Sequence, residues 1–191
     1  MEEKVIFFLQ TFDVKLFERI NHTMHNSIMD AFMPLITNTG EGGLIWIIIG
    51  LALFISRRPG VKKTALLMLV ALLASFLAGE CIKHIFQRPR PFETLPDVEL
   101  LVRPPYSFSF PSEHAANAFA AGLVLARKLP GLAWFFIPLA CVMAFSRVYV
   151  GVHYPADILV GSLLGTACAA LILRYEYYVF PVGDKLKPPI G

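Results

Sequence analysis

Long uncharged runs of apolar residues alternate with short polar segments along most of the chain. Five such runs lie at residues 43–56, 64–79, 115–126, 129–146 and 158–173. Several are shorter than the roughly 20 residues that a helix needs to cross a bilayer core, so the helices must extend into their polar flanks. The pattern predicts five membrane-spanning helices whose flanking polar groups are drawn down to membrane depth.

Residues 1–40 follow a different pattern, in which apolar and charged positions are mixed at a partly helical spacing. Asp13 and Glu18 interrupt the first apolar stretch, and residues 27–37 are mixed in the same way. Such a pattern is typical of an amphipathic helix lying flat in the membrane interface, and it leaves room for a sixth, poorly formed span. We therefore expect an interfacial N-terminal segment over residues 1–40.

The chain as a whole has the pattern of a single domain. It contains no internal repeat, and its proline-rich stretches separate predicted helices rather than domains. The expected fold class is an all-α, polytopic membrane bundle of five or six transmembrane helices. One domain would cover residues 1–191, with the helical bundle at residues 43–178.

Composition supports the membrane assignment. Hydrophobic residues make up 56% of the 191 positions, and the mean hydropathy is +0.61, which is too apolar for an ordinary soluble domain. The net charge of +3 is modest and its cations lie between apolar runs, so nucleic acid is not an expected partner. The three cysteines lie inside apolar stretches without CxxC spacing, which argues against a zinc site or a disulfide framework.

Basic residues mark one side of the predicted membrane. They follow the first, third and fifth apolar runs, at Arg57, Arg58, Lys62, Lys63, Arg127, Lys128, Arg174, Lys185 and Lys187. Basic loops favour the cytoplasm, so residues 80–106, 109–114 and 146–157 are expected on the extracytoplasmic face. This face also holds cations that the topology rule does not explain, namely Lys83, Arg88, Arg90 and Arg103. Those cations need another role.

The first polar cluster closes the second predicted span. Lys83 lies at the end of this helix, and the prolines of the sequence QRPRP stop it, so that Arg90 is presented from a stiff loop. Glu80, three residues before Lys83, lies on the same helix face and is an expected ion-pair partner. Basic residues that only contact lipid headgroups would give the same pattern, so this cluster alone leaves both interpretations open.

The second cluster, SFPSEH at residues 109–114, looks like the start of the third helix. Ser112 lies at or near the N-cap, which leaves the backbone N–H groups of Glu113 and His114 free to bind an anion. On this stretch alone, a simple serine cap with His114 contacting a headgroup is the alternative interpretation.

The third cluster joins the fourth and fifth predicted helices, from Ser146 to Asp157. His153 precedes Asp157 by four residues, close enough for the carboxylate to accept a hydrogen bond from one ring nitrogen and leave the other as a directed lone pair. His153 is therefore a candidate nucleophile. The alternative is a buried ion pair between Arg147 and Asp157 that links two helices.

Together the clusters contain three cations, a serine at a helix start and two histidines, one of them with a carboxylate. Phosphoryl transfer fits this set, because its transition state carries negative charge on three equatorial oxygens that fixed cations and amides stabilise. One histidine can attack phosphorus while the other protonates the leaving group. No spacing typical of metal ligands occurs, so we expect neither a metal nor a cofactor.

At these residues the chain resembles the type 2 phosphatidic acid phosphatase (PAP2) superfamily of membrane lipid phosphatases, which are related to vanadium haloperoxidases. Its three motifs are matched at Lys83, Arg90 and Pro91, at Pro111, Ser112 and His114, and at Ser146, Arg147, His153 and Asp157. The resemblance implies that His153 forms a phosphohistidine, Asp157 orients it, and His114 protonates the leaving oxygen and then activates water. It also implies that the phosphate is held by Lys83, Arg90, Ser112 and Arg147.

Glu113 departs from the family pattern, which has glycine at this position. A carboxylate beside a bound phosphate would repel it unless a cation is paired with the carboxylate, and we expect Arg88 or Arg103 to be that cation. These three residues would then influence headgroup selectivity. An acidic residue here is similar to some bacterial enzymes acting on undecaprenyl diphosphate. Phosphatidylglycerol phosphate, phosphatidate and lipid A phosphates are the other expected substrates.

The expected function is hydrolysis of a lipid phosphate or diphosphate at the extracytoplasmic face of the bacterial cytoplasmic membrane. The expected partners are the lipid substrate and the bilayer. A lipid phosphotransferase would use the same phosphohistidine, so the sequence does not separate it from a hydrolase. A transporter would more often show paired half-helices in repeated halves, and a membrane scaffold would not need His114, His153 and Asp157 together.

Overall fold

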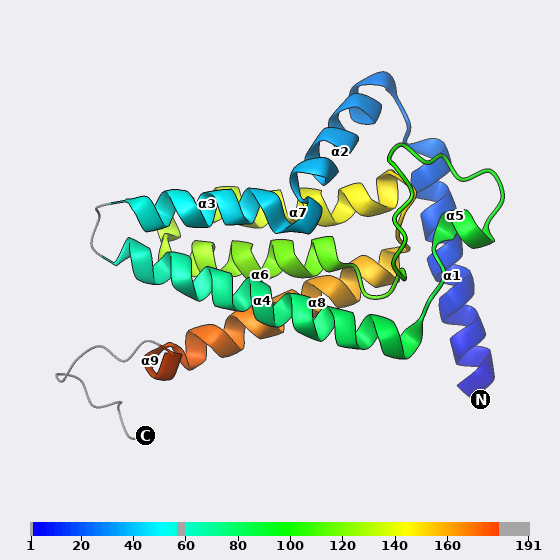
Figure 1. Cartoon of the computed structure of the whole chain (residues 1–191). Helices are drawn as coiled ribbons and strands as arrows, with labels where there is room; N and C mark the ends of the chain where they lie inside the picture. Colours follow the sequence, from blue (N-terminus) through cyan, green and yellow to red (C-terminus); the bar gives the residue numbers. More distant parts are fainter. Residues whose placement is uncertain (1, 57–59, 180–191) are drawn as a thin grey trace.

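The computed structural model describes residues 2–56 and 60–179, and this part of the chain contains helices and loops but no strand. A helix is present at each of the five predicted apolar runs, and the five helices run side by side (Figure 1). They are α3 (Leu44–Ile55), α4 (Val61–Phe86), α6 (Glu113–Lys128), α7 (Ala133–Tyr149) and α8 (Pro155–Arg174). The all-α bundle expected from the apolar runs is confirmed.

Helix α6 lies at the centre of the bundle and packs against α4, α7 and α8. Its small residues allow close approach, and the two glycines of α8 that face it allow more. A Cβ atom at Gly165 would lie 2.0 Å from the carbonyl oxygen of Ala116, and one at Gly161 would lie 2.3 Å from that of Ser112. Side chains do not fit at such distances, so the backbones of α6 and α8 lie in direct contact.

Length and apolar composition allow three helical segments of the described chain to cross a membrane. These are Val61–Thr94, Pro130–Tyr149 and Pro155–Arg174. The pair formed by α2 (Ser27–Thr39) and α3 also passes if the two are counted as one span bent by 51°. The bend lies in the short 3₁₀ helix η1 (Glu41–Gly43), where Gly42 and Gly43 have φ angles of 57° and 74° that favour glycine.

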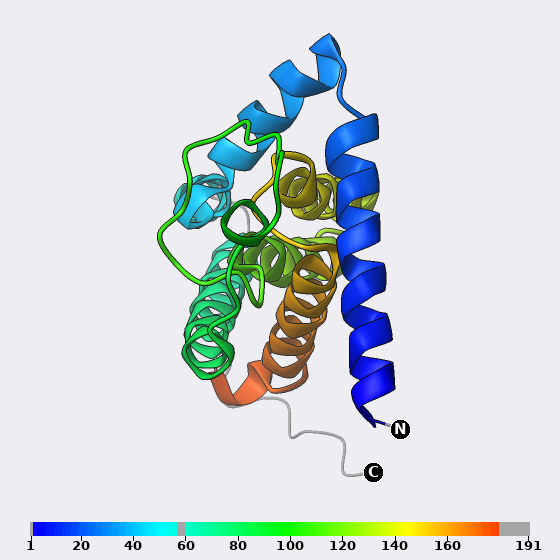
Figure 2. The same cartoon turned by 90° about the vertical axis from the view of Figure 1, so that its right-hand side faces the viewer.

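The N-terminal residues form two helices rather than one flat segment. Helix α1 (Glu2–Thr23) runs across one end of the bundle, and α2 leads from it toward α3 (Figures 1 and 2). Asn26 caps α2 by accepting a hydrogen bond from the Met29 amide. The N-terminal segment over residues 1–40 thus contains α1, which lies across the bundle end, and α2, which belongs to the bent pair.

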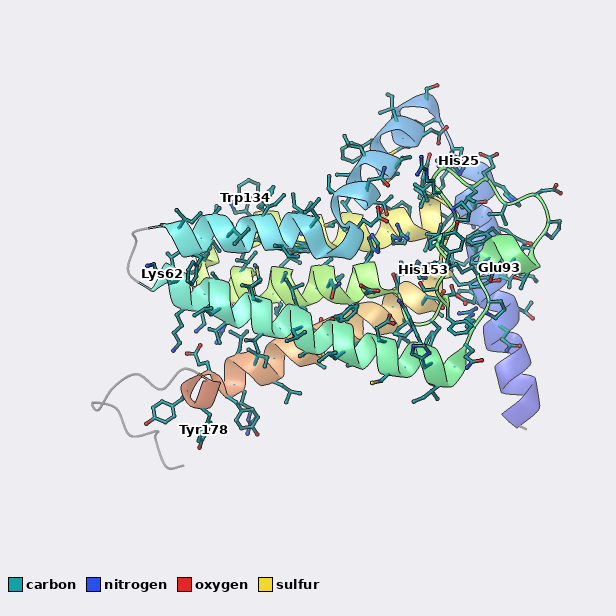
Figure 3. All side chains as sticks on the ribbon, viewed as in Figure 1. His25, Lys62, Glu93, Trp134, His153 and Tyr178 are labelled. Carbon is teal, nitrogen blue, oxygen red and sulfur yellow. The ribbon has the colours of Figure 1, made fainter. Side chains whose placement is uncertain are left out.

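The two ends of the bundle differ in their polar groups. Lys62 and Tyr178 lie at one end, and His153 and Glu93 lie at the other (Figure 3). The long connection from α5 (Pro91–Thr94) to α6 runs over the His153 end (Figure 2). Two further short elements complete the described chain, η2 (Pro130–Leu132) and α9 (Glu176–Val179). Four of the basic residues used to predict topology lie outside the described residues, namely Arg57, Arg58, Lys185 and Lys187.

Candidate active site

A pocket of about 970 Å³ opens at the His153 end of the bundle. Its walls come from the end of α2, the end of α4, residues 101–107, the start of α6 and the α7–α8 loop. The structure brings most of the predicted site residues to these walls: Lys83, Arg90, Arg103, Glu113, His114, Arg147 and His153. Three predicted residues are not among the lining residues, namely Arg88, Ser112 and Asp157.

His153 and Asp157 form the contact that their spacing predicts. Helix α8 begins at Pro155, so Asp157 lies in its first turn, where its Oδ2 accepts a hydrogen bond from the Tyr154 amide at 2.9 Å. The same oxygen lies 3.5 Å from Nδ1 of His153. This carboxylate favours the tautomer with the proton on Nδ1, and Nε2 then keeps its lone pair, 3.2 Å from Nη1 of Arg90.

Burial determines the protonation state of His153. The residue is 2% exposed, and the pKa of His153 is lowered to about 3, mainly by burial. The nearby Arg90 and Arg147 contribute to this lowering of the pKa, whereas Asp157 opposes it. His153 is therefore a neutral imidazole at neutral pH, which is the form that can act as a nucleophile.

Arg90 and Arg147 are buried, but their guanidinium groups contact neutral acceptors. Arg90 donates to the carbonyl oxygens of Ser107 and Val152 at 2.6 and 2.8 Å. Arg147 donates to Oγ1 of Thr37 at 2.5 Å, and its Nε has no partner within the described part of the chain. Among the described residues neither guanidinium forms an ion pair with a carboxylate. Both therefore present uncompensated positive charge to the pocket.

Lys83 has the opposite environment. Its Nζ lies 2.9 Å from Oε1 of Glu80 and 3.0 Å from Oε2 of Glu113, with only 3% of the residue exposed. The expected Glu80–Lys83 pair is confirmed. The expectation that Arg88 or Arg103 would pair with Glu113 is wrong, because the first turn of α6 directs Glu113 toward α4 and therefore toward Lys83.

Arg88 contacts two carboxylates that do not line the pocket. Its Nη1 donates to Oδ1 of Asp157 at 2.6 Å, and its Nη2 donates to Oδ2 of Asp13 at 2.7 Å. The alternative ion pair between Arg147 and Asp157 is not formed, because Asp157 is engaged by Arg88 and Arg147 by Thr37. Glu113, Arg88 and Arg103 thus do not form one cluster.

His114 and Ser112 lie at the start of α6. The His114 ring lines the pocket, is hydrogen-bonded to the backbone of Thr37, and its Nε2 has no partner in the described chain. Ser112 is the N-cap residue, as expected, but its hydroxyl is buried and makes no capping hydrogen bond. Its amide instead donates to the carbonyl oxygen of Asp157 at 3.0 Å, which joins the starts of α6 and α8.

Three residues around the site were missed by the sequence reasoning. Thr37 contacts both Arg147 and His114, Ser109 donates to Oδ2 of Asp157 at 2.5 Å, and Asp13 contacts Arg88. One signal was present for Asp13, because a carboxylate inside an apolar helix requires a partner. Ser109 and Thr37 carry no comparable signal. The described residues contain no group of three or more His, Cys, Asp or Glu side chains that could hold a metal ion.

Comparison with known proteins places these motifs in a family. The family model described as PAP2 superfamily matches residues 64–181. A curated undecaprenyl-diphosphatase of Sulfolobus acidocaldarius is 30% identical over 166 residues, which is 86% of this chain and 79% of that protein.

Two solved structures have the same architecture. The crystal structure of Aquifex aeolicus LpxE is 30% identical, with a TM-score of 0.75 and coverage of 85% of this chain and 94% of that one. A transmembrane PAP2-type phosphatidylglycerolphosphate phosphatase of Bacillus subtilis is 27% identical, with a TM-score of 0.72 and coverage of 91% and 88%. The family match over more than half of the chain, together with these relatives, shows that the protein belongs to the PAP2 superfamily of membrane phosphatases.

Proposed function

We propose that this protein is a membrane lipid phosphatase that removes a phosphate from a lipid phosphate or diphosphate through a phosphohistidine at His153. The observation that carries the proposal is the pocket itself. It combines a neutral, buried His153 with two guanidinium groups that have no carboxylate partner and a second histidine whose Nε2 is unpaired in the described chain. A phosphate group would supply the missing negative charge.

In the proposed first step, Nε2 of His153 attacks phosphorus and the bond from phosphorus to the leaving oxygen breaks. The electron pair stays on that oxygen, which takes a proton from His114. Asp157 stabilises the positive charge that develops on His153. Lys83, Arg90 and Arg147 bind the phosphoryl oxygens, and the buried Ser112 hydroxyl joins them when phosphate is bound.

In the second step, water attacks the phosphohistidine. His114 accepts the proton of the water, the bond between phosphorus and Nε2 breaks, and inorganic phosphate leaves. His114 thus acts first as an acid and then as a base. In this scheme the negative charge on the phosphoryl oxygens is stabilised by protein cations together with the Ser112 hydroxyl.

The substrate class follows from the relatives and from the charge of the pocket. One relative is named for undecaprenyl diphosphate and another for phosphatidylglycerolphosphate, so both types of lipid are substrates to test. We place the site at the extracytoplasmic face of the cytoplasmic membrane. Support comes from Lys62 at the far end of the bundle (Figure 3), and from Lys63, Arg127 and Lys128 at the helix termini of that end.

The test is phosphate release by purified protein in lipid vesicles. The substrates are undecaprenyl diphosphate, phosphatidylglycerolphosphate, phosphatidate and lipid A, each with and without EDTA. We expect release from at least one of them, unaffected by EDTA, and an acid-labile phosphoenzyme that His153→Ala lacks and that the matched control His22→Ala retains.

Inactivity on every lipid phosphate would contradict the proposed function, and activity lost in EDTA and regained with Mg²⁺ would contradict its metal-free chemistry. Adding acceptor lipids separates hydrolysis from transfer, because a phosphotransferase would label the acceptor rather than release phosphate.

A further inference from the structure

Arg88 connects the His153–Asp157 pair to the N-terminal helix. Its two terminal guanidinium nitrogens contact different carboxylates. Nη1 lies 2.6 Å from Oδ1 of Asp157, and Nη2 lies 2.7 Å from Oδ2 of Asp13. Asp157 is fully buried and Asp13 is 7% exposed. Two buried carboxylates therefore share one guanidinium group directly behind the proposed nucleophile.

Asp13 is also bonded to the helix that carries Asp157. Its second oxygen, Oδ1, accepts a hydrogen bond from the Ala156 amide at 2.8 Å, in the first turn of α8. A carboxylate at a helix N-terminus is favourable, because the free amides there carry partial positive charge. Asp13 thus fixes the start of α8 and the far end of the Arg88 guanidinium at the same time.

Aromatic contacts restrict the guanidinium further. The Arg88 guanidinium carbon lies 4.0 Å from the centre of the Tyr154 ring, and this ring packs against Phe17 of α1 with 5.6 Å between ring centres. The Tyr154 hydroxyl lies 2.6 Å from Oγ1 of Thr94. A planar guanidinium that is held at both terminal nitrogens, and on one face by an aromatic ring, has one available orientation.

We propose that Asp13 is a positioning residue for the phosphatase reaction, acting through Arg88 to hold Asp157 against His153. Arg88 occupies Oδ1 of Asp157, and Oδ2, which also accepts hydrogen bonds from Ser109 and the Tyr154 amide, lies 3.5 Å from Nδ1 of His153. This role rests on the proposed function of His153. Asp13 lies outside residues 64–181, the part of the chain that the family model matches.

Charge balance gives Asp13 a second effect on the nucleophile. Arg88 and Asp157 alone would be neutral together, whereas Arg88 with both carboxylates carries one net negative charge. Asp157 is the member of this cluster that contacts His153, which becomes positive as it bonds to phosphorus. Asp13 therefore lowers the free energy of the charged intermediate without contacting it.

A merely structural role for Asp13 predicts something different, and Asn21 is the matched control. Asn21 lies on the same helix and also docks α1, donating to the carbonyl oxygens of Glu99 and Tyr149 at 2.9 and 3.2 Å. It contacts neither Arg88 nor Asp157 through these bonds. If Asp13 only docks α1, Asn21→Ala should reduce turnover as much as Asp13→Asn does.

The experiment compares kcat, KM and the vanadate inhibition constant in full-length wild type, Asp13→Asn, Asp13→Glu, Arg88→Lys, the double variant Asp13→Asn/Arg88→Lys, and Asn21→Ala. We expect Asp13→Asn to lower kcat about tenfold with KM nearly unchanged, as for residues that orient a reacting group from behind. Vanadate should bind more weakly by a similar factor. Asp13→Glu should recover part of kcat, and Asn21→Ala should lower thermal stability but keep kcat.

The double variant tests the pathway through Arg88. Lysine cannot bridge two carboxylates as arginine does, so adding Asp13→Asn to Arg88→Lys should cost little more kcat. Wild-type kcat in Asp13→Asn, an equal loss in Asn21→Ala, or additive losses in the double variant would each overturn the inference. If Asp13→Asn does not fold, Asp13→Glu and Arg88→Lys test the inference instead. Each should lower kcat with KM nearly unchanged, and wild-type kcat in both would overturn the inference. Inactive wild-type protein would instead contradict the proposed function.

Discussion

The pocket contains two charged regions that are built in opposite ways. Near the α7–α8 loop, the guanidinium groups of Arg90 and Arg147 donate only to neutral acceptors, whereas Lys83, where α4 meets α6, is held between Glu80 and Glu113. A buried cation without a counterion attracts an anion strongly, and a cation with two carboxylates already has its charge balanced. The first region is therefore suited to binding and reacting with phosphate, and the second to adjusting how much additional negative charge the pocket accepts.

The largest effect should come from the two histidines that line the same pocket. We expect His153→Ala to reduce kcat by about 10⁴-fold or more, since it removes the nucleophile. His114→Ala should cost about 10²- to 10⁴-fold, the range for loss of a general acid and base. Steady-state kinetics on folded, membrane-inserted variants measure both, and near-wild-type rates in either variant would contradict the mechanism.

The next largest effect should come from changing an arginine of the first region. Arg147→Lys keeps the charge but cannot contact Thr37 and a phosphoryl oxygen together, so we expect kcat/KM to fall by about 10²-fold. The control is Arg127→Lys, an exposed arginine at the other end of α6. Equal activity in the two variants would show that the guanidinium geometry at Arg147 is not used.

A smaller effect should come from the Lys83 region. Glu113→Gln leaves Lys83 with one carboxylate, so the pocket becomes more positive and should favour the more highly charged substrate. We expect the ratio of kcat/KM for a diphosphate over a monophosphate of the same lipid to rise about threefold to tenfold, which corresponds to roughly 1 kcal/mol. Glu80→Gln removes a charge outside the pocket lining and should shift this ratio less. An unchanged ratio in Glu113→Gln would contradict a role of Glu113 in setting the charge preference of the pocket.

The smallest effect concerns pH. Because burial lowers the pKa of His153 to about 3, the neutral form persists as the pH falls and is lost only near that value. NMR of ¹³C-histidine-labelled protein, with the His153→Gln spectrum for assignment, should therefore show no titration of His153 between pH 7.5 and 5. A midpoint near the ordinary value of about 6.5 would contradict the buried, neutral state.

The helices and the motif residues that line the pocket could be predicted from the sequence because they depend on local patterns. Uncharged apolar runs mark α3, α4, α6, α7 and α8, and the spacing of four residues brings Asp157 to His153. Contacts between distant segments could not be predicted in this way. The partner of Glu113 depends on how α6 is rotated relative to α4, which no local pattern records, and so Lys83 was not recognised as its partner.

Asp13 illustrates the same limit. Its mixed, partly helical surroundings predict an interfacial helix, and α1 does lie across the end of the bundle (Figure 2). That it meets Arg88, 75 residues further along, is a property of the packed chain. The sequence indicates only that a carboxylate in such a place needs a partner.

The close contact between α6 and α8 determines which mutations outside the catalytic motifs inactivate the protein. His114 begins one of these helices and Asp157 begins the other, so their separation depends on Gly161 and Gly165, where any side chain would collide with the backbone of α6. Alleles that enlarge either glycine would inactivate the enzyme without altering a polar residue. A random loss-of-function screen would therefore recover these two codons together with those of the catalytic motifs.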